Sequence, residues 1–213
     1  ADYLGERRGR RVEIVRPRRG DRVRLLEMAR DNAVQSFRER QDGERRYERI
    51  SDELRRTLHL RNAPKRIECV DISTFQGGTA VGSLVAFDEG RPDKSGYRRY
   101  RIKTVAGQDD FAMMFEVLRR RFTRAQREQR FPDLLVVDGG KGQLNVASEV
   151  LRELGLDAVD VVGLAKQRVV RAPRAAAVER SDERVFLPGR ANPVVLRRNA
   201  TALFVLQRLR DEA

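Results

Sequence analysis

Two aspartates at the ends of apolar runs are the first residues that suggest chemistry. Asp71 lies near the end of residues 66–72, and Asp138 ends residues 133–138. A carboxylate beside buried apolar residues is costly unless it is paired or binds a metal. Together, two such carboxylates would hold one hard cation, Mg²⁺ or Mn²⁺, and align a water for attack on a phosphodiester. The alternative is that Asp138 caps the next turn and Asp71 caps a strand end.

A second pair of acids, Asp109 and Asp110, precedes a helical pattern that begins at Phe111. Acids at a helix N-terminus accept hydrogen bonds from its first amides and complement the helix dipole. The residues alone therefore favour capping over catalysis for this pair.

The run Gly139-Gly140-Lys141-Gly142 invites comparison with a phosphate-binding loop. The Walker pattern fails, because Leu135 and Gly142 stand where it requires Gly and Ser or Thr. A weaker version survives, in which backbone amides and Lys141 approach a phosphate at a helix start. The alternative is a tight turn from strand to helix.

The segment YRRYR interleaves aromatic and basic residues on an expected strand. Alternation puts Arg98 and Tyr100 on one face of that strand. The other face carries Tyr97, Arg99 and Arg101. One of these faces would contact a DNA backbone, although a solvated face is the default for any single arginine.

The chain has one histidine, His59, and one cysteine, Cys69. These counts exclude an internal disulfide and a structural zinc site built from Cys and His ligands. They also argue against a Ser-His-Asp or Cys-His hydrolase. We expect His59 to be structural or exposed. A single cysteine is typical of a protein in a reducing cytoplasm.

The chain is strongly basic, with 45 Lys and Arg against 32 Asp and Glu in 213 residues and a net charge of +13. Such an excess favours a polyanion as partner, because basic side chains release counterions from phosphates. No apolar run approaches the roughly 20 residues of a membrane span, and the N-terminus lacks the apolar region of a signal peptide. Nucleic acid is therefore the expected partner, not a membrane.

Periodicity and turn residues predict the elements that position these side chains. Strands are expected at residues 11–16, 66–72, 79–87, 97–103, 133–138, 159–165 and 184–187. Helices are expected at residues 21–60, with an interruption or weakening at Gly43, and at 109–122, 143–154 and 193–210.

The order of these elements predicts a fold class. Three strands with short links form an antiparallel meander, and the strands that follow alternate with helices. This order gives a mixed five-stranded sheet flanked by helices, which is the ribonuclease H-like order. An N-terminal strand and helical extension at residues 1–64 would precede the domain at residues 65–213.

Several blocks together resemble the C-terminal nuclease half of the UvrC family, over residues of about 5–213. The blocks are RIECVDIS from Arg66, YRRY from Tyr97, DDFA from Asp109, PDLLVVDGGKGQL from Pro132, GLAK from Gly163 and LQRLRDEA from Leu206. The resemblance implies a ribonuclease H-like endonuclease that makes the incision on the 5′ side of a DNA lesion in nucleotide excision repair.

The resemblance also implies roles for single residues. Asp71 and Asp138 match the two catalytic, metal-binding aspartates, and Asp110 matches a third important aspartate. The DNA-binding candidates are Arg98, Arg99, Lys141 and Lys166. The catalytic histidine of the family directly follows the RDEA block. The chain as given ends at Ala213, so we expect it to be a poor nuclease.

The resemblance further implies a divalent metal as cofactor and the UvrB–DNA complex as the partner of the full-length protein, with no small-molecule cofactor. The other parts of the family are not recognised here, so we expect the chain to be one portion of a longer cytoplasmic protein. Another ribonuclease H-like nuclease, such as a resolvase, is a weaker alternative. The main alternative is a ribonuclease H-like module that binds DNA without cutting it.

Overall fold

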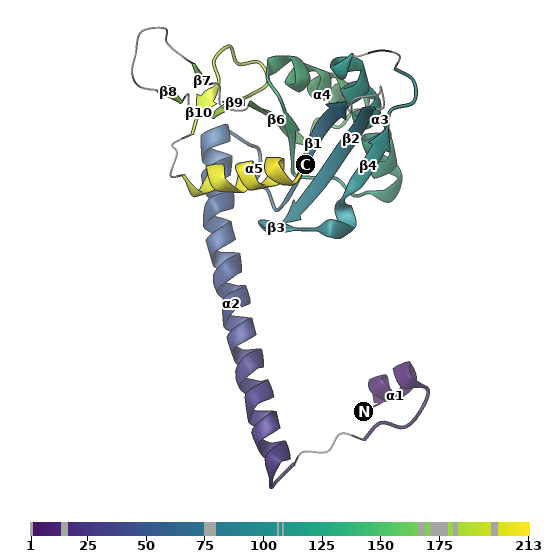
Figure 1. The fold of residues 1–213 in the computed structure, drawn as a ribbon, viewed down its shortest axis with the longest axis vertical. Helices are drawn as coiled ribbons and strands as arrows, with labels where there is room; N and C mark the ends of the chain where they lie inside the picture. The colour runs from purple at the N-terminus through teal and green to yellow at the C-terminus, as the bar shows by residue number, and fades with distance from the viewer. Residues whose placement is uncertain are drawn as a thin grey trace. The chain divides into compact units, whose positions relative to one another are not determined.

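The computed structural model describes residues 2–13, 17–74, 80–105, 107, 109–165, 169–170, 179–180, 183–196 and 200–213. The chain divides into two compact units, Ala1–Arg45 and Arg46–Ala213. The helices (Figure 1) are α1 (Asp2–Arg8), α2 (Asp21–Leu58), the 3-10 helix η1 (Lys94–Gly96), α3 (Asp110–Glu128), α4 (Lys141–Glu153) and α5 (Thr201–Glu212). The strands are β1 (Arg66–Thr74), β2 (Ala80–Asp88), β3 (Arg91–Pro92), β4 (Arg98–Arg101), β5 (Leu134–Asp138), β6 (Asp160–Ala165), β7 (Val169–Val170), β8 (Glu179–Arg180), β9 (Arg184–Phe186) and β10 (Val194–Val195).

The first unit differs from the sequence prediction in three places. Of the strand expected at residues 11–16, residues 11–13 have no regular structure, and residues 14–16 lie outside the described residues. Helix α1 was not predicted. Helix α2 runs without a break through Gly43, so the expected interruption there is wrong. One glycine costs a helix only about 1 kcal/mol, which the strong helix formers around it offset.

The second unit is built on one mixed sheet with the order β10-β9-β6-β5-β1-β2-β3, and β4 also pairs with β2. Strands β1 and β2 are antiparallel, β2 and β4 are antiparallel, and β1, β5 and β6 are parallel neighbours. These five strands are the mixed sheet that the sequence predicted. Strands β3, β9 and β10 extend this sheet. The sequence did not predict strands β3 and β10, because each has only two residues.

Each face of the sheet is covered by helices, and alternation along the strands sorts the core into two clusters. Ile67 and Cys69 of β1 pack toward α5 and the C-terminal turns of α2; we call this side the α5 face. Val70 of β1 packs toward α3 and α4, and this side is the α3 face. Strand β5 has four consecutive buried residues because it contributes to both clusters.

The last predicted helix begins later than the sequence suggested. Residues 193–210 were expected to be helical, but Val194–Val195 form β10 and α5 begins at Thr201. Val194 pairs with Val185 of β9, so a tertiary strand pairing overrides the local helical pattern. The predicted strand at residues 184–187 is confirmed as β9.

Candidate functional site

Asp71 and Asp138 each lie one residue beyond the last paired residues of the neighbouring parallel strands β1 and β5. Strands β1 and β5 are parallel neighbours with Val70 opposite Val137, and each aspartate follows one of these valines. Side chains in register on parallel strands point to the same face. Asp71 is two residues beyond Cys69, and Asp138 two beyond Val136, which both belong to the core of the α5 face. The two carboxylates therefore share the α5 face.

The surroundings of these carboxylates are polar on one side and apolar on the other. The hydroxyl of Ser73 donates to Oδ2 of Asp71 at 3.0 Å. On the other side, Asp138 pairs in register with Leu164 of β6, which is fully buried. Both aspartates are half-buried, so they remain reachable by a solvated ion. Ser73 was not singled out from the sequence, although its position two residues after Asp71 on one strand was a usable signal.

The turn after Asp138 packs tightly on β6. A Cβ atom at Gly163 would lie 3.1 Å from the carbonyl oxygen of Gly139, so a glycine allows this close approach without displacing the turn. The N–H of Gly140 donates to Oε1 of Gln143 at 3.1 Å, which uses one amide that a phosphate would need. Lys141 opens α4 and is exposed. The turn thus positions Asp138 and leaves Lys141 free to contact a polyanion.

The acids before α3 divide their roles. Oδ1 of Asp109 accepts from the N–H groups of Phe111 and Ala112 at 3.1 and 3.0 Å, so Asp109 is the N-cap. Asp110 is the first helical residue and is exposed. A Cβ at Gly142 would clash with the ring of Phe111, so the start of α3 rests on the start of α4. Asp110 therefore lies near the turn that follows Asp138, but outside any acidic cluster found in the described residues.

The sheet separates the two predicted arginines. Register sets Asp71 opposite Ser83 of β2, and Ser83 opposite Arg99 of β4. Arg99 therefore lies in the row of the aspartates and is exposed. Arg98 lies on the α3 face, where its guanidinium donates to the carbonyls of Ser95 and Tyr97 at 2.8 and 2.7 Å.

The end of α5 lies close to this row. A cavity of about 320 Å³ is lined by Ser83 and Arg99 together with Glu212 and Ala213 at the end of α5. Tyr97 lines the same cavity, and burial, followed by its interaction with Glu212, raises the pKa of Tyr97 to about 12. Ser83 could not be found from the sequence, because only the strand register brings it beside Asp71.

Two other acids in the core have structural partners. Glu68 is fully buried and accepts two hydrogen bonds from Arg121 at 2.9 and 2.8 Å. Glu116 of α3 accepts from the backbone N–H groups of Lys103 and Thr104 at 3.0 and 2.9 Å. Burial by itself would raise the pKa of Glu116, but these hydrogen bonds lower it to about 2. Both side chains hold helix α3 to the sheet and its loops.

The donor set at the sheet edge fits a hard cation. Asp71 and Asp138 supply carboxylate oxygens, which Mg²⁺ and Mn²⁺ prefer, and magnesium keeps several waters when only one or two carboxylates bind it. Across the described part of the chain, no group of three or more acidic, histidine or cysteine side chains is arranged to hold a metal. Any ion here would rely on two aspartates and water.

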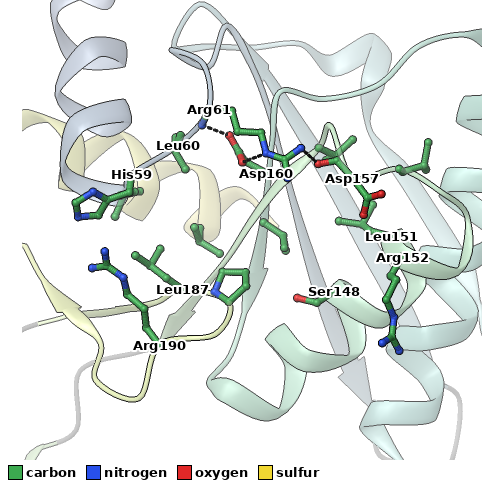
Figure 2. A pocket seen from close by; sticks show the side chains of 16 residues that line it. His59, Leu60, Arg61, Ser148, Leu151, Arg152, Asp157, Asp160, Leu187 and Arg190 are labelled. Atoms are coloured by element: carbon green, nitrogen blue, oxygen red, sulfur yellow. Dashed lines mark hydrogen bonds and ion pairs between the residues drawn. The ribbon is translucent and has the colours of Figure 1, made fainter.

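His59 lies at the opposite edge of the sheet. It is exposed and lines a cavity of about 380 Å³ beside Arg61 and Asp160, the first residue of β6 (Figure 2). The N–H of Arg61 donates to Oδ2 of Asp160 at 2.8 Å. Since β6 reaches Asp138 only near its other end, at Leu164, His59 is remote from the aspartates. The expectation that it is exposed is confirmed.

Two remaining observations bear on the expected partners. Lys166 lies outside the described residues, so its predicted role stays a prediction. Among the described residues, no helix combines the length and apolar character needed to cross a membrane.

Comparison with known proteins gives one consistent family. The family described as UvrC RNAse H endonuclease domain matches residues 55–213, and the UvrC Ribonuclease H-like domain family matches residues 1–40. The UvrABC system protein C of Geobacter metallireducens is 54% identical over 213 residues, covering 100% of this chain and 35% of that protein. That of Syntrophotalea carbinolica is 52% identical over 216 residues, with coverage of 100% and 35%. The chain thus spans about a third of the length of these relatives.

Among solved structures, an endonuclease V of Ciona intestinalis in complex with inosine-containing DNA is similar with a TM-score of 0.40 and 13% identity. The likeness covers 65% of this chain and 61% of that one. It is too loose to bear on the chemistry of this chain. The strand order and the family match together confirm the ribonuclease H-like fold class.

Proposed function

Because the chain belongs to the UvrC RNase H endonuclease domain family, we propose that it hydrolyses DNA phosphodiesters with a divalent metal ion. In the full-length protein, this activity would make the 5′-side incision of nucleotide excision repair. The observation that carries the proposal is the parallel register of β1 and β5, which brings Asp71 and Asp138 to one edge and one face.

The two aspartates would hold Mg²⁺ or Mn²⁺. When bound, the ion would neutralise charge on the phosphodiester and lower the pKa of a bound water. Residues of the chain would orient the aspartates and support the reaction. Ser73 fixes one oxygen of Asp71 through its hydrogen bond, which orients that carboxylate. Asp110 is exposed at the start of α3. It would contribute to catalysis from the side of the turn that joins β5 to α4.

The basic side chains around this edge would bind the DNA backbone. Arg99 shares the row of the aspartates, and Lys141 stands three residues beyond Asp138. Lys166 and Arg98 complete the predicted set, and Arg98 would contact DNA only from the α3 face. In the full-length protein, the partner would be the UvrB–DNA complex in the cytoplasm, with no small-molecule cofactor.

Manganese binding tests the proposal directly. Titration of Mn²⁺ followed by electron paramagnetic resonance should give one site in the parent chain. Asp71→Asn and Asp138→Asn should each lose that site while keeping the circular dichroism spectrum of the parent. Asp157→Asn is the matched control, because Asp157 is an exposed acid at the opposite edge. If both edge variants bind manganese as the parent does, a non-catalytic DNA-binding module is the better description.

The family histidine gives a second test. In the UvrC family, this histidine directly follows the block that here ends at Ala213. Glu212 and Ala213 line a cavity together with Ser83, which is the register partner of Asp71. An imidazole there would lie on the face of the aspartates and could handle the proton of the attacking water. A chain extended after Ala213 by a histidine and a few helical residues should nick plasmid DNA in Mn²⁺ well above the parent. Equal nicking would contradict this role.

A further inference from the structure

An apolar groove lies beside the N-terminal half of helix α3. Its volume is about 630 Å³, and Phe111, Phe115 and Val146 line it. Phe111 leaves 49% of its surface exposed. The opposite face of the same helix is fully used in the core, through residues such as Val117 and Leu118. Phe115 and Val146 also pack against the core, so Phe111 is the aromatic ring of the groove that a ligand could reach.

The charges around the groove favour an anionic occupant. Glu116 is the acid that lines it, and its carboxylate is already bonded to the N–H groups of Lys103 and Thr104 and to Arg120. The guanidinium of Arg120 also donates to the carbonyl of Arg101. Lys103 and Arg119 line the groove as exposed cations. An apolar floor with a cationic rim fits a ligand that carries both a flat apolar group and a phosphate.

The groove also begins beside the candidate catalytic edge. Phe111 directly follows Asp110 in α3. Its ring fills the space where Gly142 of α4 has no side chain. Gly142 is four residues beyond Asp138, so one end of the groove adjoins the turn that carries that aspartate. A nucleotide bound near Asp138 would have this aromatic ring within its neighbourhood.

We propose that the groove binds a nucleobase of an unpaired DNA strand, stacked on Phe111, with its phosphates held by Lys103 and Arg119. Aromatic side chains in a basic groove stack on bases without regard to sequence, and each stacked base adds about 1–3 kcal/mol to binding. This proposal deepens the proposed function and rests on it, because it supplies a substrate subsite beside the turn that follows Asp138. It requires that the strand be unpaired near the groove, since a base within a duplex cannot reach the ring.

The absence of tryptophan from the sequence permits a direct test. Phe111→Trp introduces one tryptophan at the groove, and excitation selective for tryptophan leaves out the four tyrosines. Two 12-nucleotide single strands serve as probes, one complete and one with abasic sites in the central positions, so that the phosphates are the same. The complete strand should quench the emission of F111W, and the abasic strand should leave it nearly unchanged. Phe204→Trp is the matched control, because Phe204 is an exposed phenylalanine on α5; its emission should not distinguish the strands.

Affinity provides the second readout. By fluorescence anisotropy, Phe111→Ala should bind the complete strand about tenfold more weakly than the parent and the abasic strand equally well. Phe204→Ala should match the parent on both strands. Equal quenching of F111W by the two strands, or equal loss of affinity for both, would overturn the subsite. An unchanged emission of F111W with both strands would also overturn the subsite. An apolar protein segment would then be the better candidate for the groove.

The two proposals fail separately. If Asp71→Asn and Asp138→Asn keep manganese binding while F111W still distinguishes the strands, the metal site is wrong and the base subsite stands. If those variants lose manganese and F111W does not distinguish the strands, the groove assignment alone is wrong. Thermal unfolding of every variant ensures that each comparison is between folded proteins.

Discussion

Glu68 and Asp71 lie three residues apart on β1, yet the structure treats their carboxylates in opposite ways. Glu68 points to the α3 face, is fully buried and is bonded twice to Arg121 and once to Arg66. Asp71 points to the α5 face at the edge of the sheet, is half-buried and accepts a hydrogen bond from a neutral serine.

This difference shows what separates a structural acid from a candidate ligand. A buried carboxylate with charged partners has its charge neutralised inside the protein, and its removal leaves a buried cation. A carboxylate held by a neutral hydroxyl beside a second aspartate is suited to bind an external cation. The predictions that follow set these two kinds of acid against each other.

The largest effect is expected from Glu68. Glu68→Gln should lower the free energy of unfolding by about 3–5 kcal/mol, because Arg121 then stays buried without its charged partner. Urea denaturation measures this loss. Asp71→Asn is the control on the same strand and should change stability by less than about 1 kcal/mol. Similar losses for the two variants would erase the distinction between the acids.

The next effect concerns activity at the edge. Asp71→Asn and Asp138→Asn should each reduce manganese-dependent nicking of plasmid DNA by at least about a hundredfold. The double variant should lose no more than either single variant, because both residues serve one ion and their effects do not add. Nicking is measured in the chain extended by the family histidine. Losses that multiply in the double variant would indicate that the aspartates act independently.

A smaller effect is expected from pH at Glu116. Hydrogen bonds from Thr104, Lys103 and Arg120 overcome the effect of burial and lower the pKa of Glu116 from 4.5 to about 2. A lowered folded pKa stabilises the protein above the unfolded pKa, so this contribution is lost as pH falls from 4.5 toward 2. The difference in unfolding free energy between the parent and Glu116→Gln should therefore shrink across that window. A constant difference would contradict the assignment.

The smallest effect separates the two neighbouring arginines. Arg99→Ala should weaken binding of duplex DNA severalfold and reduce the slope of log affinity against log salt by about 1, as for one lost phosphate contact. Arg98→Ala should change this binding less, because its guanidinium is bonded to backbone carbonyls on the opposite face. Both are measured by anisotropy over a salt series. A larger effect of Arg98→Ala would move the DNA to the α3 face.

Much of the fold could be predicted because local patterns carried it. The all-apolar run of β5 and the helical periods of α3 and α4 agreed with the structure. The errors arose where local signals were weak or were overridden. Helix α2 continued through Gly43, and Val194–Val195 joined the sheet instead of α5. Capping was predicted for the pair of acids before α3, and the structure assigns it to Asp109 alone.

By itself, the sequence determined the basic charge, the two runs with an aspartate at or near the end, and the alternation that sets Arg98 and Arg99 on opposite faces. Only the tertiary structure decided that Asp71 and Asp138 are neighbours, that Ser83 lies in their row and that Arg99 shares their face. The physical reason is that alternation is a property of each strand's own backbone. Register between strands far apart in the chain is instead selected by the packing of both sheet faces against their helices.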